Sequence, residues 1–366
     1  MPAHSNDSGF LKADLVRQFM QLLESWKTGE SISIIVAQVD PDGIASAHVS
    51  KAIFESRGIA CEIYYAGSFG HPQNQLIYNE WELMKTMRPI SELPEQGPLG
   101  LVDSSRFEDA RFGSEVRIDP ARFIFRVDHH LDQTTKIKDG FDLIESCGSA
   151  TTLCTLLARA LEVPLDKQLR TLAAVGIHSD TEQLTLSITR NEDIQSFAWL
   201  MSEGDQEKLE ASFNFRLPPQ FADLEREVLS TLEMVDGVRI AHATSLMKEE
   251  DGDLLSIIAN RQRRNEGAAT TVIWGVTGGW VRASIRSYSK ELPLTKFIEA
   301  IFGKGKGGAK HGSGGARYQL AEPHVPFPDT AELLIKFLSA QYKCRIQQMR
   351  GRGGSDRNGK NGKSQA

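Results

Sequence analysis

Acidic and imidazole side chains close apolar runs at four places in the first half of this sequence. The clearest is Asp128-His129-His130, which follows the apolar segment Phe123–Val127. Carboxylates and imidazoles bind metals and carry protons, and parallel strands of α/β sheets present functional groups at their carboxyl ends. The candidate ligands at the four places are Asp40 and Asp42, Asp103, His129 and His130, and Asp180.

Gathered at one edge of a sheet, these carboxylates would repel one another, and burying them is costly unless cations neutralise them. The pattern therefore predicts a metal site. Carboxylate and imidazole ligands suit Mn²⁺, Mg²⁺ or Fe²⁺ better than a thiolate-preferring ion. If one carboxylate bridges two ions about 3.5–4 Å apart, the pair can generate hydroxide and clamp a phosphoryl group. The predicted chemistry is phosphoester hydrolysis.

Each of these motifs also has a purely structural interpretation. Asp42-Gly43 is a common turn dipeptide, and Asp103-Ser104-Ser105 or Ser179-Asp180-Thr181 could cap a helix. His71-Pro72-Gln73-Asn74 could be a loop that enters a helix. Four apolar runs that end in acidic residues, together with a His pair, are poorly explained by turns alone. We therefore favour the metal site.

The elements that must position these residues alternate between two hydrophobic patterns. Short apolar runs read as buried strands, and segments with apolar residues at helical spacing lie between them. This alternation predicts an open, mostly parallel α/β sheet with helices on both faces, whose ligands bind beyond the carboxyl ends of the strands. The predicted strands are 32–37, 59–65, 99–102 and 123–127, and the predicted helices are 15–26, 44–57, 74–87, 149–161 and 166–177.

A second, smaller α/β domain is expected after a change in composition. Charge rises over residues 206–222, where Pro218-Pro219 interrupts any helix, so we predict a linker there. The glycine-rich segment 303–315 either cradles phosphate with its backbone amides, aided by Lys306, Lys310 and His311, or forms a surface hairpin. The expected strands are 238–243, 270–276 and 280–285, the expected helices are 254–261 and 294–302, and Thr277-Gly278-Gly279 is the expected hairpin turn.

Composition limits the class of protein. The chain has 366 residues, enough for two domains, and a net charge of −6. Its four cysteines form no Cys-x-x-Cys pair, which argues against a structural zinc site and a disulfide framework. No apolar stretch approaches the roughly 20 residues of a membrane span, and the N-terminus lacks the pattern of a secretory signal. We therefore expect a cytoplasmic protein with reduced thiols.

Together, the motifs resemble the DHH phosphoesterase superfamily with its associated C-terminal domain. The layout is most similar to small bacterial nanoRNases that also dephosphorylate phosphoadenosine phosphate, and the likeness covers roughly residues 30–320. The segments that carry it are Asp40-Pro41-Asp42-Gly43, Leu101-Val102-Asp103, Asp128-His129-His130 and Gly176–Thr181, with Gly67–Asn74, Ser146–Thr152, Arg282–Ser287 and the loop around Gly308 and His311.

This resemblance implies a role for each residue. Two Mn²⁺ ions, or Mg²⁺ or Fe²⁺ in their place, would be bound, with Asp103 as the bridge. His130 would contact the scissile phosphate or protonate the leaving oxygen, and Asp128 would orient neighbouring groups. One ion would be held by Asp42 and Asp103 and the other by Asp103, His129 and Asp180. Asp40 would substitute for the neutral Gln38. The substrate-binding residues would be His71, Asn74, Arg286, Gly308, Lys310 and His311.

The predicted function is metal-dependent hydrolysis of short oligonucleotides, dinucleotides or phosphoadenosine phosphate. The partner would be a short single-stranded nucleic acid or a nucleotide, no membrane is expected, and a homodimer is compatible with the sequence. Two departures from the family pattern keep other functions open: Gln38 stands where His or Asp is usual, and Ile44 where another Asp is common. The alternatives are a catalytically weakened nucleotide-binding regulatory module and a single-strand exonuclease for longer substrates.

The implied domain organisation follows the motifs. We predict a DHH phosphoesterase domain over 1–205, a linker over 206–222, a DHH-associated substrate-binding domain over 223–325 and a C-terminal helix over 326–344. Residues 345–366 are basic and glycine-rich with few apolar side chains, so we predict a disordered tail. This tail is either a solvated terminus or an arm that contacts nucleic acid.

Overall fold

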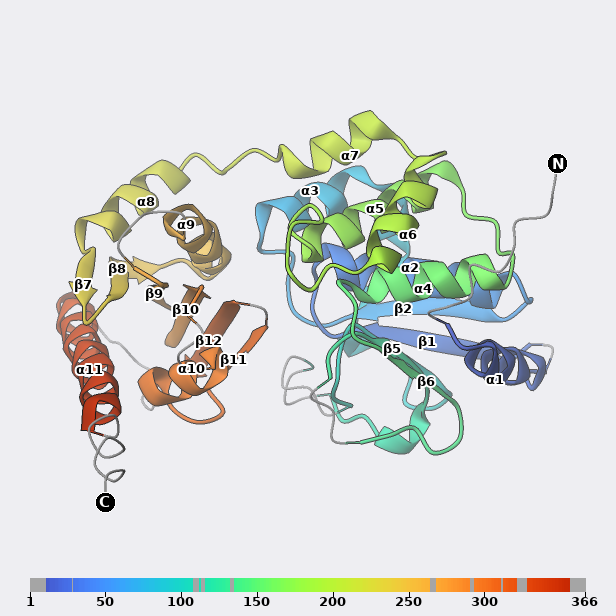
Figure 1. Ribbon diagram of the computed structural model, residues 1–366, viewed down its shortest axis with the longest axis horizontal. Helices are drawn as coiled ribbons and strands as arrows, with labels where there is room; N and C mark the ends of the chain where they lie inside the picture. The colour runs from blue at the N-terminus through green and yellow to red at the C-terminus, as the bar shows by residue number, and fades with distance from the viewer. Residues whose placement is uncertain are drawn as a thin grey trace, which may run out of the picture. The chain divides into compact units, whose positions relative to one another are not determined.

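The structure is a computed structural model, and it describes residues 11–27, 29–107, 112, 116–131, 135–263, 268–289, 293–310, 312–320 and 328–355. The chain forms two compact units, Met1–Arg216 and Leu217–Ala366. Each unit contains one six-stranded sheet (Figure 1). Within the described ranges, no helix is long and apolar enough to cross a membrane.

The first sheet is parallel throughout. Its strand order is β3-β2-β1-β4-β5-β6, so the chain first extends the sheet to one side of β1 and then adds β4 on the other side. Ligands of open α/β sheets bind at such a reversal, beyond the carboxyl ends of the strands. The predicted α/β class with a mostly parallel sheet is confirmed. The strands are β1 (Ser31–Val36), β2 (Ala60–Tyr65), β3 (Met87–Pro89), β4 (Leu99–Val102), β5 (Phe123–Asp128) and β6 (Phe141–Ile144).

The α-helices of the first unit pack on one face of its sheet, in the core where Phe19 stacks on Phe141 at 4.5 Å between ring centroids. The opposite face packs against connecting segments that carry Ile90 and Phe107. Helices were expected on both faces, but the connections on this second face form only short 3₁₀ turns among the described residues. The helices are α1 (Ala13–Glu24), α2 (Pro41–Glu55), α3 (Pro72–Glu80), α4 (Ala150–Ala160), α5 (Lys167–Asp180), α6 (Asn191–Met201) and α7 (Gln206–Phe213), with the 3₁₀ helices η1 (Glu82–Thr86), η2 (Ile90–Glu92) and η4 (Pro120–Arg122).

Two helix boundaries differ from the prediction, and both affect candidate ligands. Helix α2 begins at Pro41 rather than Ile44, because Asp40 caps it by accepting a hydrogen bond of 2.9 Å from the Gly43 amide. Helix α5 continues to Asp180, so this carboxylate lies at a helix end. The predicted helix 166–177 therefore extends three residues further than expected and includes Asp180.

Two other predicted segments also change. The predicted helix 74–87 ends at Glu80, because Trp81 is extended and η1 and β3 follow it. The predicted linker 206–222 contains α7, whose Leu209 is buried in the first core. The many charged residues on the exposed side of α7 hid its short apolar face in the sequence.

The second unit contains a mixed sheet in the order β11-β12-β10-β9-β8-β7, in which β8 and β9 are parallel and the other pairs antiparallel. Gly278 and Gly279 form the expected hairpin turn between β9 and β10, with φ of 52° and 85° that glycine adopts without strain. The glycine-rich segment forms the hairpin β11–β12, in which Gly308 lies opposite Gly315. The strands are β7 (Glu233–Val235), β8 (Val238–Met247), β9 (Thr270–Thr277), β10 (Trp280–Ser287), β11 (Gly307–Lys310) and β12 (Ser313–Gln319); the helices are α8 (Phe221–Ser230), η5 (Glu249–Asp253), α9 (Leu254–Gln262), α10 (Leu294–Phe302) and α11 (Pro328–Ser355).

The last helix is longer than the sequence suggested. Helix α11 runs to Ser355, and its Tyr342 and Ile346 are buried in the core of the second unit. Residues 345–355 are therefore helical, which corrects the prediction that a disordered tail begins at Arg345. The few apolar residues of this stretch suffice because they fall on the side of the helix that packs against the sheet. Residues 356–366 lie outside the described part of the chain.

Candidate metal centre

The carboxyl edge of the first sheet brings the predicted ligands together. Asp103 follows β4, and His129 and His130 follow β5. Asp40 and Asp42 lie where β1 leads into α2, and Asp180 is the last residue of α5. The reversal of strand order between β1 and β4 falls at this edge, as expected for a ligand site in an α/β sheet.

His129 lies at the middle of the group. Its Nε2 is 3.3 Å from Asp103 Oδ1, 3.5 Å from Asp180 Oδ2 and 3.7 Å from Asp42 Oδ2. Its Nδ1 lies 3.1 Å from the carbonyl oxygen of Cys147. Because a carbonyl can only accept, Nδ1 donates its proton there, and Nε2 is the ring nitrogen that faces the carboxylates.

This donor set fits a divalent cation with a preference for oxygen and imidazole ligands. Two atoms that each bind one ion at about 2.1 Å lie about 3.0–3.5 Å apart, close to the observed separations around His129. The ligand atoms fall into two groups, each within 4.8 Å: Asp103 with His129 and His130, and Asp42 with His129 and Asp180. The geometry therefore accommodates a metal centre among these residues.

The surroundings of Asp40 disfavour its negative charge. Desolvation by burial raises the pKa of the Asp40 carboxyl well above its usual range, and the negative charges of Asp103, Asp180 and Asp42 raise it further. The hydrogen bond from the Gly43 amide acts in the opposite direction but is the weaker influence. A cation among these carboxylates would remove the repulsion and favour the ionised form of Asp40.

Asp103 is held in an uncommon backbone conformation where β4 ends. Its φ is 49°, in the left-handed region that Asp tolerates better than most side chains. Its N–H still donates to the Val127 carbonyl at 3.1 Å, so the residue stays attached to β5. The bend places the carboxylate next to His129, and strain of this kind is common at functional sites.

The Asp42 carboxylate is held by the first residues of α4. Ser149 donates its hydroxyl proton to Oδ1 at 2.9 Å, and the amides of Ala150 and Thr151 donate to Oδ2 and Oδ1, both at 2.9 Å. The positive end of a helix stabilises a carboxylate in this position. Sequence reasoning placed residues 146–152 in a family segment but gave them no role. The available signal was Ser149, a typical N-cap residue before an apolar helical run.

A glycine in α5 lets the helices that carry Asp42 and Asp180 approach each other. A Cβ atom on Gly176 would lie 2.7 Å from Thr151 Oγ1 and 2.8 Å from Ala45 Cβ. Both distances are too short for a side chain, so α5 packs closely against α2 and α4 only because residue 176 is glycine.

Asp128 and His130 form a separate pair beside the ligands. Asp128 Oδ1 lies 2.6 Å from His130 Nδ1 and also accepts hydrogen bonds from the backbone amides of His129 and His130. Asp128 is fully buried, whereas the side chain of His130 is 28% exposed. The pair thus has an anchored carboxylate and an imidazole that solvent or a substrate can reach.

His71 and Asn74, predicted to bind substrate, have contacts that shape the neighbouring chain. Asn74 is buried, and its Nδ2 donates to the Val39 carbonyl at 2.6 Å, which fixes the segment between β1 and Asp40. His71 caps α3 by accepting from the Gln73 amide at 3.2 Å. Gln38 itself is exposed at the end of β1. A role of His71 and Asn74 in substrate binding stays a prediction.

The other predicted substrate residues belong to the second unit. Arg286 on β10 donates to Asn260 Oδ1 at 2.5 Å and to Ser284 Oγ at 3.0 Å. Gly308 and Lys310 lie on the edge strand β11. His311 lies outside the described residues. A substrate-binding role for these four residues stays a prediction.

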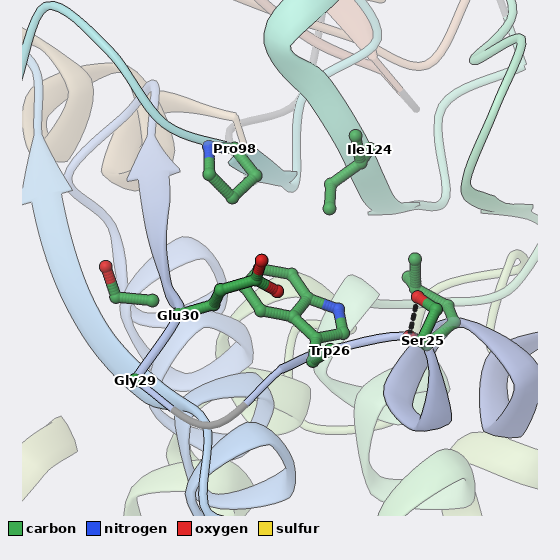
Figure 2. A pocket seen from close by; sticks show the side chains of 8 residues that line it. Ser25, Trp26, Gly29, Glu30, Pro98 and Ile124 are labelled. Carbon is green, nitrogen blue, oxygen red and sulfur yellow. Dashed lines mark hydrogen bonds between the residues drawn. The ribbon is translucent and has the colours of Figure 1, made fainter.

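A hollow of about 400 Å³ lies at the opposite edge of the first sheet. Figure 2 shows the Trp26 indole facing Pro98 and Ile124 across it, and Glu30 also lines the hollow. Pro98 precedes β4, and Ile124 is the second residue of β5, so the hollow is at the amino ends of these strands. It is therefore separate from the candidate metal centre.

The sequence is similar to a curated protein over part of its length. No family model matches the sequence. An uncharacterized protein of Methanocaldococcus jannaschii is 24% identical over 269 residues, which are 73% of this chain and 54% of that relative. This chain therefore spans about half the length of that curated relative.

Several solved structures superpose on most of this chain. An exopolyphosphatase-related protein from Bacteroides fragilis superposes with a TM-score of 0.65 and 15% identity, over 92% of this chain and 98% of that one. RecJ from Thermus thermophilus in complex with Mn²⁺ has a TM-score of 0.51 and 12% identity, over 92% of this chain and 55% of that one. The DHH domain of a member of the s1p family of ribosomal proteins has a TM-score of 0.51 and 12% identity, over 91% of each chain. This chain therefore has the fold shared by these structures, one of which is described as a DHH domain, as the order of its motifs indicated.

Proposed function

We propose that this protein is a metal-dependent phosphoesterase that hydrolyses short oligonucleotides, dinucleotides or phosphoadenosine phosphate. The observation that carries the proposal is the position of His129 Nε2, within 3.3–3.7 Å of three carboxylates from three separate segments. A buried cluster of this kind is unfavourable unless a cation compensates it. The resemblance of the motifs to nanoRNases supports the choice of substrates.

Four residues would hold the metal: Asp42, Asp103, His129 and Asp180, with Asp40 beside them. Bound divalent ions lower the pKa of water and neutralise the charge that develops on a phosphoryl group. We favour Mn²⁺, because a structure with this fold, RecJ from Thermus thermophilus, is described in complex with Mn²⁺. Mg²⁺ and Fe²⁺ suit the same donors.

His130 would give a proton to the leaving oxygen or hold the phosphate. Asp128 supports that role, because its Oδ1 lies 2.6 Å from Nδ1 and so fixes the tautomer and orientation of the ring. The carboxylate in turn is fixed by the backbone amides of His129 and His130. The acid chemistry on a substrate would then fall to His130 Nε2.

The second unit would contribute recognition of the substrate's phosphate or base. Arg286 is held by Asn260 and Ser284 on the same unit, which fixes the position of a guanidinium whose positive charge would attract a phosphate. Gly308, Lys310 and His311 are the other candidates. Alanine variants of Arg286 should raise KM more than they lower kcat if this recognition role is correct.

A second candidate function rests on Gln38. This residue is exposed at the end of β1, and its neutral side chain is a weak metal ligand. A protein with one poorly held ion would bind nucleotides as a regulatory module without turning them over. Gln38→His separates the two functions: a gain of turnover from an inert wild type supports the regulatory module, and unchanged rapid turnover removes it.

The hydrolase proposal is tested with a panel of substrates. Purified wild-type protein and Asp103→Ala are incubated with Mn²⁺ and labelled RNA and DNA of two to five nucleotides, linear dinucleotides and phosphoadenosine phosphate. Wild type should release mononucleotides or phosphate, and the variant should be slower by at least about 10³-fold, because several kcal/mol of charge stabilisation is lost. Equal inertness of both proteins on every substrate would contradict the proposal.

A further inference from the structure

The segment Cys147–Thr152 touches two candidate ligands that come from different parts of the chain. The carbonyl of Cys147 accepts from His129 Nδ1, which aims Nε2 at the carboxylates. Two residues later, Ser149 donates to Asp42 Oδ1, and the next two amides hold the same carboxylate. One short segment thus orients a ligand that follows β5 and a ligand on α2.

A buried carboxylate outside the metal centre fixes this segment. Asp193, on α6, is inaccessible to solvent. Its Oδ2 accepts from the Gly148 amide at 2.9 Å, and its Oδ1 accepts from Thr152 Oγ1 at 2.6 Å. The two bonds fall on either side of Ser149, so Asp193 determines where the start of α4 lies.

The packing around Gly148 leaves this anchor little freedom. A Cβ atom at residue 148 would lie 2.4 Å from Thr181 Cγ2 and 2.8 Å from Asp193 Oδ2. Thr181 directly follows Asp180, the ligand at the end of α5. The anchored segment is therefore in close contact with the chain that carries a third candidate ligand.

We propose that Asp193 is a positioning residue for the metal centre, acting through Gly148, Thr152 and Ser149 on Asp42 and His129. The proposal rests on the proposed function, since it assumes that these ligands bind metal. Groups that orient metal ligands typically contribute 10–100-fold to metal affinity. The competing role for Asp193 is capping of α6 alone, because its Oδ2 also accepts from the Arg190 amide at 2.7 Å.

The two roles differ in their effect on metal affinity. Positioning predicts that loss of the carboxylate weakens Mn²⁺ binding, whereas capping alone predicts a lower Tm of the metal-free protein with unchanged affinity. Mn²⁺ is titrated calorimetrically into the full-length wild type, Asp193→Asn and Ser149→Gly. Glycine is nearly as good an N-cap as serine, so Ser149→Gly removes the bond to Asp42 with little loss of helix stability.

Asp166→Asn is the matched control. Asp166 caps α5 by accepting from the Leu169 amide at 2.7 Å and is exposed, so this variant removes the same charge from a helix start in the same unit. We expect the Kd for Mn²⁺ to rise about 10–100-fold in Asp193→Asn and Ser149→Gly and to change less than about twofold in Asp166→Asn. Unchanged Kd values in the first two variants overturn the positioning role. A wild type that binds no Mn²⁺ overturns the proposed function as well, so the two failures are distinguishable.

Discussion

Asp128 Oδ1 and His130 Nδ1 lie 2.6 Å apart, and the carboxylate is fully buried while the imidazole is partly exposed. The same oxygen accepts hydrogen bonds from the backbone amides of His129 and His130, so the backbone at the end of β5 holds the pair in place. Three consecutive residues therefore separate into a carboxylate that orients, an imidazole within the ligand cluster and an imidazole at the surface of the site.

This division of roles predicts different consequences for the two histidines. In His130→Gln, kcat should fall about 10²–10⁴-fold, the usual contribution of an acid–base group, while the Kd for Mn²⁺ changes less than about twofold. In His129→Gln the metal affinity itself should be lost. Steady-state kinetics with calorimetric Mn²⁺ titration of both variants checks the prediction. Loss of Mn²⁺ binding in His130→Gln would count against the assigned roles.

Removal of the Asp40 charge should stabilise the metal-free protein. Because its folded-state pKa is raised above the unfolded value of about 3.9, the folded protein binds more protons than the unfolded chain between these two pKa values. This group therefore lowers stability progressively as pH rises through that window. Asp40→Asn keeps the N-cap of α2, since Asn caps as well as Asp, and should be more stable than wild type at pH 7 without metal.

Urea unfolding from pH 4 to pH 8 checks the Asp40 prediction. The difference between Asp40→Asn and wild type should grow with pH in the metal-free proteins and shrink when Mn²⁺ is added, because the cation stabilises the ionised wild-type carboxylate. A pH-independent difference between Asp40→Asn and wild type would show that Asp40 carries no raised pKa.

Much of the centre could be predicted from the sequence, because its ligands follow two of the most regular signals in the chain. The buried runs of β4 and β5 end directly before Asp103 and Asp128, so their position at a sheet edge follows from the strand pattern. Asp180 could not be placed in this way. Helix α5 continues through the polar residues His178 and Ser179, and local propensity does not show where it ends.

The long-range hydrogen bonds of Ser149 and Asp193 could not be predicted from sequence patterns. Ser149 lies 107 residues from Asp42 in the chain, and the bond between them depends on how α4 packs against α2. Asp193 has the spacing of an ordinary helix cap, which gives no hint of its bonds to Gly148 and Thr152. Long-range hydrogen bonds of this kind have no periodicity to reveal them.

The ion pair between Arg126 on β5 and Asp142 should contribute strongly to the free energy of unfolding. Arg126 is inaccessible to solvent, donates Nε and Nη2 to the two oxygens of Asp142 at 2.8 Å, and also donates to the carbonyls of Ser105 and Thr135. Asp142→Ala should cost about 3–5 kcal/mol, because it leaves a buried guanidinium charge unpaired.

The double variant Arg126→Met/Asp142→Leu separates charge from packing. Apolar replacement of both partners should recover most of the stability lost in Asp142→Ala. Chemical denaturation of the metal-free proteins measures both values. If the double variant is no more stable than Asp142→Ala, the carbonyl contacts or the packing of Arg126 dominate rather than its charge.

Because the chain packs closely around Gly176, replacing this glycine with alanine should destabilise the protein, whereas the same change in most helices stabilises it. Gly→Ala inside a helix normally stabilises by about 1 kcal/mol. Gly176→Ala should instead destabilise by about 1–3 kcal/mol, because the new Cβ meets Thr151 Oγ1 and Ala45 Cβ. It should also weaken Mn²⁺ binding, since α5 carries Asp180. A more stable Gly176→Ala protein with normal Mn²⁺ affinity would contradict the packing argument.

The metal centre is tested most directly by pulsed electron paramagnetic resonance of Mn²⁺ added to wild type, His129→Gln and His130→Gln. The position of His129 Nε2 among three carboxylates predicts nitrogen hyperfine coupling from a bound imidazole in wild type and in His130→Gln. The coupling should be absent in His129→Gln. Coupling that persists in His129→Gln, or a wild type that shows none, would contradict the central claim that His129 and its carboxylate neighbours bind the metal.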